Sequence, residues 1–530
     1  MKHSYVNKPA EIWVAKGVYY PDVGSDQLEN DEDSTFMITD GVALYGGFSF
    51  GDTNFSDRDW KNNLTVLSGD LKQDDTNTNG VVLTTSHIVD DNARHVVTAI
   101  EVSGTAVLDG FTITAGDADE NNDPDYWGGG FICYGLANRC HPTLKNIKFS
   151  GNYAEYDGGA MFNFGQHDGS SSPTLENVEF SGNSAGDDGG AMYNNGYDGI
   201  SSPILREVTF TNNTAGDYGG AMYNNGDDGI SSPMLNNVVF SGNLAGDDGG
   251  AMHNDGSDSG TSSPTLIDVE FSSNSSHEGG AMYNEGDVGN NKPRLTRVIF
   301  SGNSATYGGA MFNDGDEGTS NPTLHNVLFS GNSAIYDGGA MLNDGSDKGQ
   351  SKPILNNVTF SGNSAHEEGG AIYNYGDHMG TCSPQIRNSI LWNNQDISGT
   401  GSVSSTIFND SATAVISNSL VQGTGASGGG WIGGSYVDGG GNIDTDPMFI
   451  TPVEPSSAPT TDGDLHLKEG SPAIDVGNNL YIDCTGVLSD LDGEARKVDG
   501  NKDGVSTVDM GAFEKQLDYQ FDVYTPIIFH

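Results

Sequence analysis

The chain has 530 residues, enough for a large hydrophobic core or several domains, and carries 73 Asp and Glu against only 22 Lys and Arg, a net charge of −51. A surface this acidic repels nucleic acid and anionic membranes, so nucleic acid is excluded as a partner. The same charge attracts divalent cations. No apolar stretch of membrane length predicts a transmembrane segment.

Residues 1–127 are expected to form irregular β-helix coils and an N-terminal cap. Residues 11–21, 41–48 and 106–113 are short apolar runs bounded by turn formers, which is typical of strands. Solenoid proteins need atypical terminal units to cover their open ends. The first residues, Met1 to Ser4, lack the apolar core of a signal peptide.

Residues 128–395 repeat a pattern of 29 to 31 residues. Each repeat holds Gly-Gly-Ala followed by Met or Ile, then one proline and a Phe-x-x-Asn unit, of which Ile390 and Asn393 form a ninth, degenerate copy. A period near 30 is also typical of helical repeats, but Gly-Gly and Pro interrupt every unit before ten helical residues accumulate. The pattern therefore predicts an all-β fold in which parallel strands stack as a solenoid with coils of about 30 residues. The Met or Ile positions are Met161, Met192, Met222, Met252, Met282, Met311, Met341 and Ile372.

Side chains at fixed positions of each coil are expected to fill the core. Leu175, Val178 and Phe180, with their equivalents in other coils, should point inward. The Met column should do the same, because that position admits only Met or Ile. The Asn of each Phe-x-x-Asn unit is expected to stack in an amide ladder at a corner of the coil.

The position after the Met column is usually aromatic, and two interpretations stay open. It tolerates His and Leu, which indicates a partly exposed stack that could bind sugar rings or a partner protein. The alternative is packing between coils beneath the loops. The residues are Phe162, Tyr193, Tyr223, His253, Tyr283, Phe312, Leu342 and Tyr373.

Acidic residues also recur in register. One column follows the Met strand, and a second precedes Gly-Gly, where two coils carry Tyr218 and Tyr307 instead. Stacked carboxylates repel one another unless they are solvated or bridged by a cation, and calcium accepts such oxygen ligands. The first column is Asp168, Asp198, Asp228, Asp258, Asp287, Asp316, Asp347 and Asp377; the second is Asp157, Asp188, Asp248, Glu278, Asp337 and Glu368.

Residues 396–450 are expected to form C-terminal coils, and residues 451–530 a C-terminal cap or anchor-type region. The segment Asp499 to Gly504 reads D-x-N-x-D-G, the first half of a calcium loop. The twelfth position of the loop is Met510, with an acid one residue earlier. We therefore predict calcium as the cofactor, with metal ligands Asp499, Asn501, Asp503 and Asp509; a plain acidic turn is the alternative.

The four cysteines predict one disulfide. Cys140 and Cys382 share a column but lie eight coils apart, roughly 38 Å at about 4.8 Å per coil, too far to bond. Cys133 and Cys140 flank one loop and can meet. We expect a Cys133–Cys140 bridge, with Cys382 and Cys484 unpaired.

The chain resembles the bacterial choice-of-anchor Q domain family over nearly its whole length. The shared motifs are residues 441–449, 470–477, 490–493 and 508–514 together with the N-terminal runs. The resemblance implies an exported right-handed parallel β-helix with atypical terminal coils. The Gly-Gly-Ala-Met and Phe-x-x-Asn units also resemble those of polymorphic outer-membrane proteins, which are autotransported adhesins.

These observations predict a non-catalytic secreted or cell-surface protein that acts in adhesion or as a structural extracellular component. Self-association into filaments or sheets is one expected interaction, and binding to a polysaccharide or a surface protein is another. The alternative is a polysaccharide lyase or glycoside hydrolase of the β-helix type. A single coil in which an Arg or His faces an acid cluster would favour that enzyme.

Overall fold

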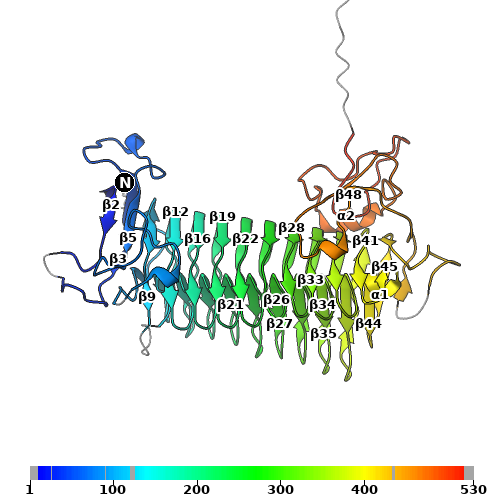
Figure 1. Cartoon of the computed structure of the whole chain (residues 1–530), viewed down its shortest axis with the longest axis horizontal. Coiled ribbons are helices and arrows are strands. Elements are labelled where there is room, and N and C mark those ends of the chain that lie inside the picture. The colour runs from blue at the N-terminus through cyan, green and yellow to red at the C-terminus, as the bar shows by residue number, and fades with distance from the viewer. Residues whose placement is uncertain (1–9, 25–26, 90, 120–125, 433–435, 518–530) are drawn as a thin grey trace, which may run out of the picture.

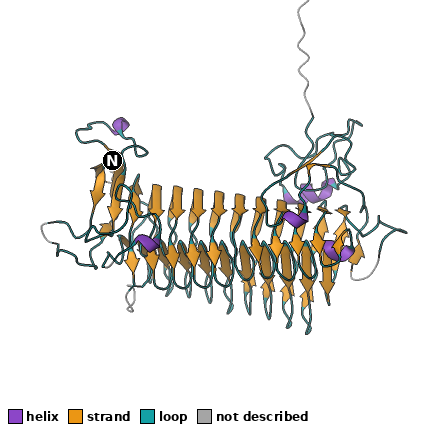
Figure 2. Cartoon of the chain, viewed as in Figure 1, coloured by secondary structure: helices purple, strands orange, loops and turns teal. Residues whose placement is uncertain are grey.

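The structure, a computed structural model, describes residues 10–24, 27–89, 91–119, 126–432 and 436–517. Its parallel strands stack as a β-solenoid of about 13 turns with about 31 residues per turn. The solenoid forms the long rod of Figure 1, and Figure 2 shows its strands stacked in rows along the rod and joined by loops. The predicted all-β, parallel β-solenoid fold class is therefore confirmed.

One sheet of 19 strands forms the long wall of the rod. Its central strands have eight residues each, and every one pairs in parallel with the equivalent strand of the next coil, as Phe149 does with Phe180 and Phe180 with Phe210. The strands are β1 (Ala10–Ala15), β2 (Gly17–Tyr19), β4 (Val42–Phe48), β5 (Thr65–Ser68), β7 (Val107–Asp109), β8 (Thr112–Thr114), β12 (Thr143–Ser150), β16 (Thr174–Ser181), β19 (Ile204–Thr211), β22 (Met234–Ser241), β25 (Thr265–Ser272), β28 (Arg294–Ser301), β32 (Thr323–Ser330), β36 (Ile354–Ser361), β40 (Gln385–Arg387), β41 (Ile390–Trp392), β45 (Ala414–Ser417), β46 (Leu420–Val421) and β47 (Tyr436–Asp438).

A second sheet of 12 strands carries the Met column. Its strands are β3 (Phe36–Ile38), β6 (Val97–Ile100), β10 (Phe131–Tyr134), β14 (Met161–Phe164), β18 (Met192–Asn195), β21 (Met222–Asn225), β24 (Met252–Asp255), β26 (Met282–Glu285), β30 (Met311–Asp314), β34 (Met341–Asp344), β38 (Ile372–Tyr375) and β44 (Ile407–Asp410).

Strands of two residues complete the coils at their corners. They are β9 (Asp117–Ala118), β11 (Arg139–Cys140), β13 (Tyr153–Ala154), β15 (Ser170–Ser171), β17 (Ser184–Ala185), β20 (Thr214–Ala215), β23 (Leu244–Ala245), β27 (Asn290–Asn291), β29 (Ser304–Ala305), β31 (Thr319–Ser320), β33 (Ser333–Ala334), β35 (Gln350–Ser351), β37 (Ser364–Ala365), β39 (Thr381–Cys382), β42 (Gln395–Asp396) and β43 (Gly399–Thr400). The helices are short: α1 (Val403–Thr406), α2 (Asn479–Thr485) and the 3-10 turns Phe55–Asp57, Thr85–His87 and Pro455–Ser457.

The core is a set of like-on-like columns. The Met column is fully buried, as predicted, and so are Leu175 and Phe180. The Phe residues equivalent to Phe180 form a second column, in which neighbouring rings stack with centroids 4.6 to 4.8 Å apart. Because parallel coils are spaced by this distance, identical side chains in successive coils meet face to face.

The predicted asparagine ladder is present, with one correction at its end. From Asn152 to Asn332, each amide nitrogen donates a hydrogen bond to the amide oxygen of the following Asn of the ladder, the last acceptor being Asn363, at 2.9 to 3.0 Å. The next member is Asn394, not Asn393, because Phe360 pairs with Leu391 rather than Ile390. The degenerate copy is therefore shifted by one residue from the sequence alignment.

The N-terminal coils join the same sheet. Strand β1 pairs with β4, which pairs with β7, and β7 pairs with β12. Residues 49–64 leave the coil between β4 and β5 as an arm. The predicted disulfide is confirmed in this part of the chain: Cys133 and Cys140 are bonded with Cα atoms 5.7 Å apart, and Cys382 and Cys484 are free.

The C-terminal segment packs along the side of the rod. It contains β48 (Phe449–Thr451) and β49 (Asp464–Leu467), which are antiparallel, and helix α2. Apolar side chains including Phe449 and Met510 pack there with Leu328 and Ile390 of the 19-stranded sheet. The segment therefore rests on the outer face of this sheet, above the C-terminal half of the rod in Figure 1. At the end of the rod, Trp431 and Tyr436 pack against the central core.

Candidate functional site

Three of the four predicted calcium ligands share one exposed loop. The carboxylate of Asp499 accepts hydrogen bonds from the backbone N–H groups of Asp503 and Gly504, at 3.0 and 2.9 Å. The side chain of Asn501 accepts one from Asp503, and Asp503 accepts one from Val505, both at 2.9 Å. These side-chain to backbone hydrogen bonds close the loop into a tight turn.

The fourth predicted ligand, Asp509, is turned away into the interior. Its two carboxylate oxygens accept hydrogen bonds from the backbone N–H groups of Asp475 and Lys515, at 2.7 and 2.6 Å, and the residue is 1% exposed. The loop instead reaches Asp475, whose carboxylate accepts the N–H of Asn501 at 2.6 Å and whose other oxygen is buried without a partner. Sequence reasoning missed Asp475 because it lies 24 residues before the loop motif begins.

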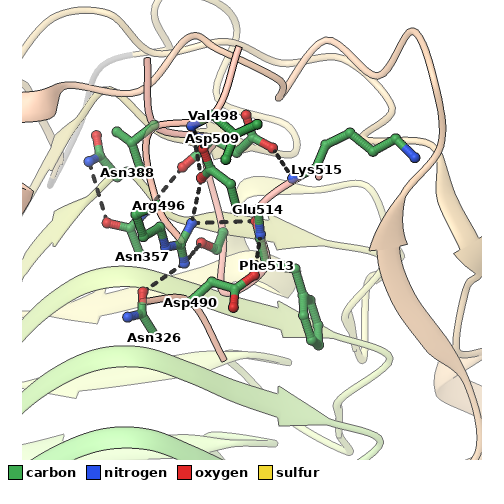
Figure 3. Close-up of polar contacts among 12 residues, drawn as sticks. Asn326, Asn357, Asn388, Asp490, Arg496, Val498, Asp509, Phe513, Glu514 and Lys515 are labelled. Carbon is green, nitrogen blue, oxygen red and sulfur yellow. Dashed lines mark hydrogen bonds and ion pairs between the residues drawn. The ribbon is translucent and has the colours of Figure 1, made fainter. Parts of the chain in front are cut away.

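Asp509 belongs to a buried charge network around Arg496 (Figure 3). The guanidinium of Arg496 contacts the carboxylate of Glu514 at 3.2 Å, and both side chains are fully buried. Arg496 also donates to the carbonyls of Gly511 and Ala512, at 2.9 and 2.6 Å. Burial and the nearby charge of Glu514 raise the pKa of Asp509.

This network attaches the C-terminal segment to the solenoid. Arg496 donates to Asn326 of β32 at 2.6 Å, and Asn357 of β36 donates to the carbonyl of Asp509 at 2.9 Å. Asn388, between β40 and β41, accepts from the N–H of Asn478 at 2.8 Å. These three Asn occupy one column on successive coils, so the site is a structural clamp built on the repeat.

The aromatic column is buried rather than exposed. The described side chains from Phe162 to Leu342 are 0 to 7% exposed. Polar members bond across coils: Tyr223 donates to Asp255, and Tyr283 donates to Asp314, both at 2.9 Å. This placement agrees with packing between coils and not with an exposed sugar-binding stack.

One coil breaks the aromatic column with a histidine that faces acids. The Nε2 of His253 lies 3.0 Å from Glu285, and its ring stacks between those of Tyr223 and Tyr283 at 4.9 Å. Burial alone would lower the pKa of His253, but the hydrogen bond and charge of Glu285, with Asp248, raise it. A histidine that faces acids in a single coil is the arrangement expected of a polysaccharide-active enzyme.

The position of His253 limits what it can do chemically. The residue is 1% exposed, and both faces of its ring are covered. Burial also raises the pKa of the acids preceding Gly-Gly, to about 7 for Asp188 and about 6 for Asp248. The buried His253 therefore offers no exposed surface on which a polysaccharide could lie.

Carboxylates close enough to share a metal occur elsewhere. Among the described residues, three acidic ligand atoms come within 4.8 Å of one another only at Asp70, Asp74 and Asp75, in the N-terminal coils. Asp75 already accepts hydrogen bonds from Val89 and Asn92, at 2.6 and 2.9 Å. The in-register acids Asp168, Asp198 and Asp228 line an acidic hollow of about 430 Å³ along the loops.

A cavity lies on the outer face of the 19-stranded sheet. It has a volume of about 520 Å³ and forms where the arm 49–64 stands over strands β12, β16 and β19. Its lining combines polar and apolar residues: Trp60, Lys61, Leu64, Thr65, Gly110, Phe111, Thr112, Asn146, Ile147, Lys148, Asn177, Val178, Glu179, Ser181, Glu207, Thr209 and Thr211. The sequence motifs did not predict this cavity, because the arm and the strands that line it are far apart in the chain.

Comparison with known protein families finds the Chlamydia polymorphic membrane protein repeat in two places, residues 207–225 and 357–375. Both matches start inside an eight-residue strand and end with the last residue of a Met-column strand, β21 or β38. They therefore contain the Phe-x-x-Asn and Gly-Gly-Ala units of two coils. No curated protein matches the chain significantly. Within the described part of the chain, no helix is long and apolar enough to cross a membrane.

Proposed function

We propose that the chain is a non-catalytic adhesin-type protein, displayed on the cell surface or released outside the cell. The observation that carries this proposal is the occurrence of two polymorphic membrane protein repeats within one uninterrupted solenoid. The long outer face of the 19-stranded sheet supports it, since a rigid rod can hold a binding face away from its point of attachment.

The finer features of the proposal rest on the sequence motifs. We assign the chain to the choice-of-anchor Q type of exported β-helix, with calcium bound at the loop that carries Asp499, Asn501 and Asp503. A surface polysaccharide or surface protein is the proposed partner. End-to-end association of rods is the second proposed interaction, since open β-helix ends present unpaired strand edges.

The experiment has two parts and uses the full chain. Intact producing cells are treated with a protease, and peptides from residues 128–395 should be released before any cytoplasmic marker. The purified chain, immobilised on beads, should retain cells or cell-wall polysaccharide. If peptides from residues 128–395 are not released from intact cells by the protease, and the medium contains none of them, surface display and secretion are both contradicted.

A polysaccharide-active enzyme is the second candidate, because two carboxylates, Glu179 and Glu207, line the outer-face cavity. Paired carboxylates are the catalytic groups of most glycoside hydrolases. Incubation with the retained polysaccharide separates the candidates. New reducing ends or unsaturated products would favour the enzyme, and their absence during sustained binding would favour the adhesin.

A further inference from the structure

We propose that the cavity between the arm 49–64 and the outer face of the 19-stranded sheet is a binding site for a neutral oligosaccharide. The inference rests on the proposed adhesin function and names its ligand class and its site.

The arm is held rigidly against the sheet. Arg58 donates to the carbonyl of Gly46 at 2.6 Å and contacts the buried carboxylate of Asp109 at 2.5 Å. The backbone of Trp60 lies so close to Gly47 that a side chain there would clash, with a Cβ 2.5 Å from the Trp60 Cα. The cavity wall is therefore preorganised, which reduces the entropy lost when a ligand binds.

The floor of the cavity is held by hydrogen bonds that begin at Asp109, the partner of Arg58. Asn146 donates to Asp109 at 2.7 Å, and Asn177 donates to the side-chain oxygen of Asn146 at 2.7 Å. On the next coil, Glu207 follows in the same column and is exposed. This column presents two amides and a carboxylate at coil spacing, and hydrogen bonds fix the orientations of the two amides.

This floor offers no free strand edge to a ligand. Strand β16 pairs with β12 on one side and β19 on the other, and the pairing is interrupted only at the left-handed residues Asn146, Asn177 and Glu207. An extended peptide that binds by adding a strand needs a free edge, which the middle of a sheet does not offer. Sugar hydroxyls suit this surface better, because each one both donates and accepts hydrogen bonds.

The charge of the cavity differs from that of the whole chain. Lys61 and Lys148 oppose Glu179 and Glu207 in the lining, although the chain carries a net charge of −51. Lys148 is already bonded to Glu179 at 2.8 Å. A locally balanced site in a strongly negative field does not favour an anionic polysaccharide, so a neutral one is the better fit.

Trp60 supplies the apolar part of the site. It lines the cavity beside the exposed Leu64, and the Lys61 ammonium lies 5.2 Å from the centre of its ring. Aromatic rings combine a flat apolar face with a polar edge, which suits the C–H face of a sugar. The volume of about 520 Å³ is typical of ligand sites and leaves room for a short oligosaccharide.

The test measures binding of the full chain to immobilised neutral oligosaccharides (glucans, mannans and galactans) and to acidic ones (polygalacturonate and heparin). Wild type should bind at least one neutral oligosaccharide and none of the acidic set. Trp60→Ala should weaken that binding at least tenfold. Thr209→Val should weaken it about threefold, and the fold should tolerate it, because the next coil carries Val239 in the same position.

Glu270→Ala is the matched control, since Glu270 occupies the position of Thr209 two coils away and does not line the cavity. It should bind like wild type. Binding of acidic oligosaccharides only, no binding at all, or full binding by a normally folded Trp60→Ala variant would overturn the proposal. If cell attachment then persists and is insensitive to Trp60→Ala, the adhesin function stands and only this site fails.

Discussion

At the residue scale, the clearest feature is the single cation buried among three acids. Arg496 is fully buried and is surrounded by Asp490, Asp509 and Glu514, all buried. Its hydrogen bonds reach backbone carbonyls of the C-terminal segment and the side chain of Asn326 on the solenoid. Removing one partner of a buried charge pair leaves the others uncompensated, which costs far more than losing a surface pair.

We therefore expect Arg496→Ala to destabilise the attachment of the C-terminal segment by about 3 to 5 kcal/mol. Hydrogen exchange of residues 449–517 should accelerate strongly, while the central coils keep their protection. Lys497→Ala is the control, because its ion pair with Asp483 is partly exposed; its effect should stay within about 1 kcal/mol. Unchanged exchange in Arg496→Ala would show that the clamp does not hold the segment.

The calcium loop gives a second test at this scale. Asp499→Asn should weaken calcium binding at least tenfold by calorimetry, because a charged ligand is replaced by a neutral one. Asp475→Asn should also weaken it, since the carboxylate of Asp475 contacts the loop. Asp509→Asn removes no calcium ligand, because both oxygens of Asp509 accept backbone N–H groups, so it should weaken calcium binding less than Asp475→Asn does.

The control for the loop is Asp462→Asn, an exposed acid in the same segment. If Asp509→Asn abolishes binding and Asp475→Asn does not, the ligand set predicted from the sequence is correct and the one indicated by the structure is wrong. Absence of calcium binding in wild type would identify the loop as a plain acidic turn.

At the element scale, the asparagine ladder ties neighbouring coils together. The side chain of Asn243 accepts hydrogen bonds from the N–H and the amide nitrogen of Asn213, both at 3.0 Å. It donates to the carbonyl of Phe210 at 3.1 Å and to Asn274 at 2.9 Å. All these groups are buried, so each depends on its partner in the ladder.

Asn243→Ala should cost about 3 kcal/mol or more, since it leaves several buried groups without a partner at about 1 to 3 kcal/mol each. Exchange should rise mainly in the coils on either side, because a solenoid is stabilised by contacts between neighbours. Asn236→Ala, an exposed Asn of the same coil, should change stability by less than about 0.5 kcal/mol. A loss of protection spread evenly over all coils would contradict the nearest-neighbour picture.

Much of the structure at the scale of strands and coils could be predicted from the sequence repeat. The Met column, the asparagine ladder and the Cys133–Cys140 bridge follow from spacing, because each coil repeats the same environment. The shift from Asn393 to Asn394 did not follow, since the chain offers two adjacent Asn and a period of 29 to 31 residues admits both. Strand pairing decides between them, and Asn393 instead donates to Val453 of the C-terminal segment.

The sites outside the repeat were harder to predict. The Arg496 clamp and the outer-face cavity each join segments distant in the chain, and neither has a periodic signal. Asp509 is an example. Its spacing within the calcium-loop motif predicts a metal ligand, but the buried Met510 and Phe513 turn this part of the chain inward. Local spacing predicts local contacts, whereas docking of a segment on the rod depends on surfaces that only the fold creates.

At the scale of the whole molecule, the dominant property is the number of carboxyl groups, some of which are buried in the rod and others exposed on its surface. Burial raises the pKa of several stacked or clustered carboxyls, to about 7 for Asp117, Asp188, Glu278 and Asp314, and to about 6 for Asp75, Asp227 and Asp248. Burial acts in the opposite sense on His95 and His325, lowering each pKa to about 4.

These shifts set the direction of the pH dependence. Between about pH 4 and pH 7, the raised carboxyls hold protons in the folded state that they lack in the unfolded state, so folding stability rises as pH falls through 7. His95 and His325 oppose this below about pH 6.5, because they take up protons only when unfolded, but they are outnumbered. The melting temperature should therefore increase by several degrees from pH 8 to pH 5.5, measured at constant ionic strength.

Asp188→Asn isolates one contribution to this pH dependence. Asn can keep the hydrogen bond that Asp188 accepts from the N–H of Tyr218, while the buried charge is lost. The variant should be more stable than wild type at pH 8, by roughly 1 to 3 kcal/mol, and the difference should shrink toward pH 5.5, where Asp188 is protonated in the folded state. A variant less stable than wild type at pH 8 would mean that a bound cation compensates this carboxylate, and chelator should then remove the difference.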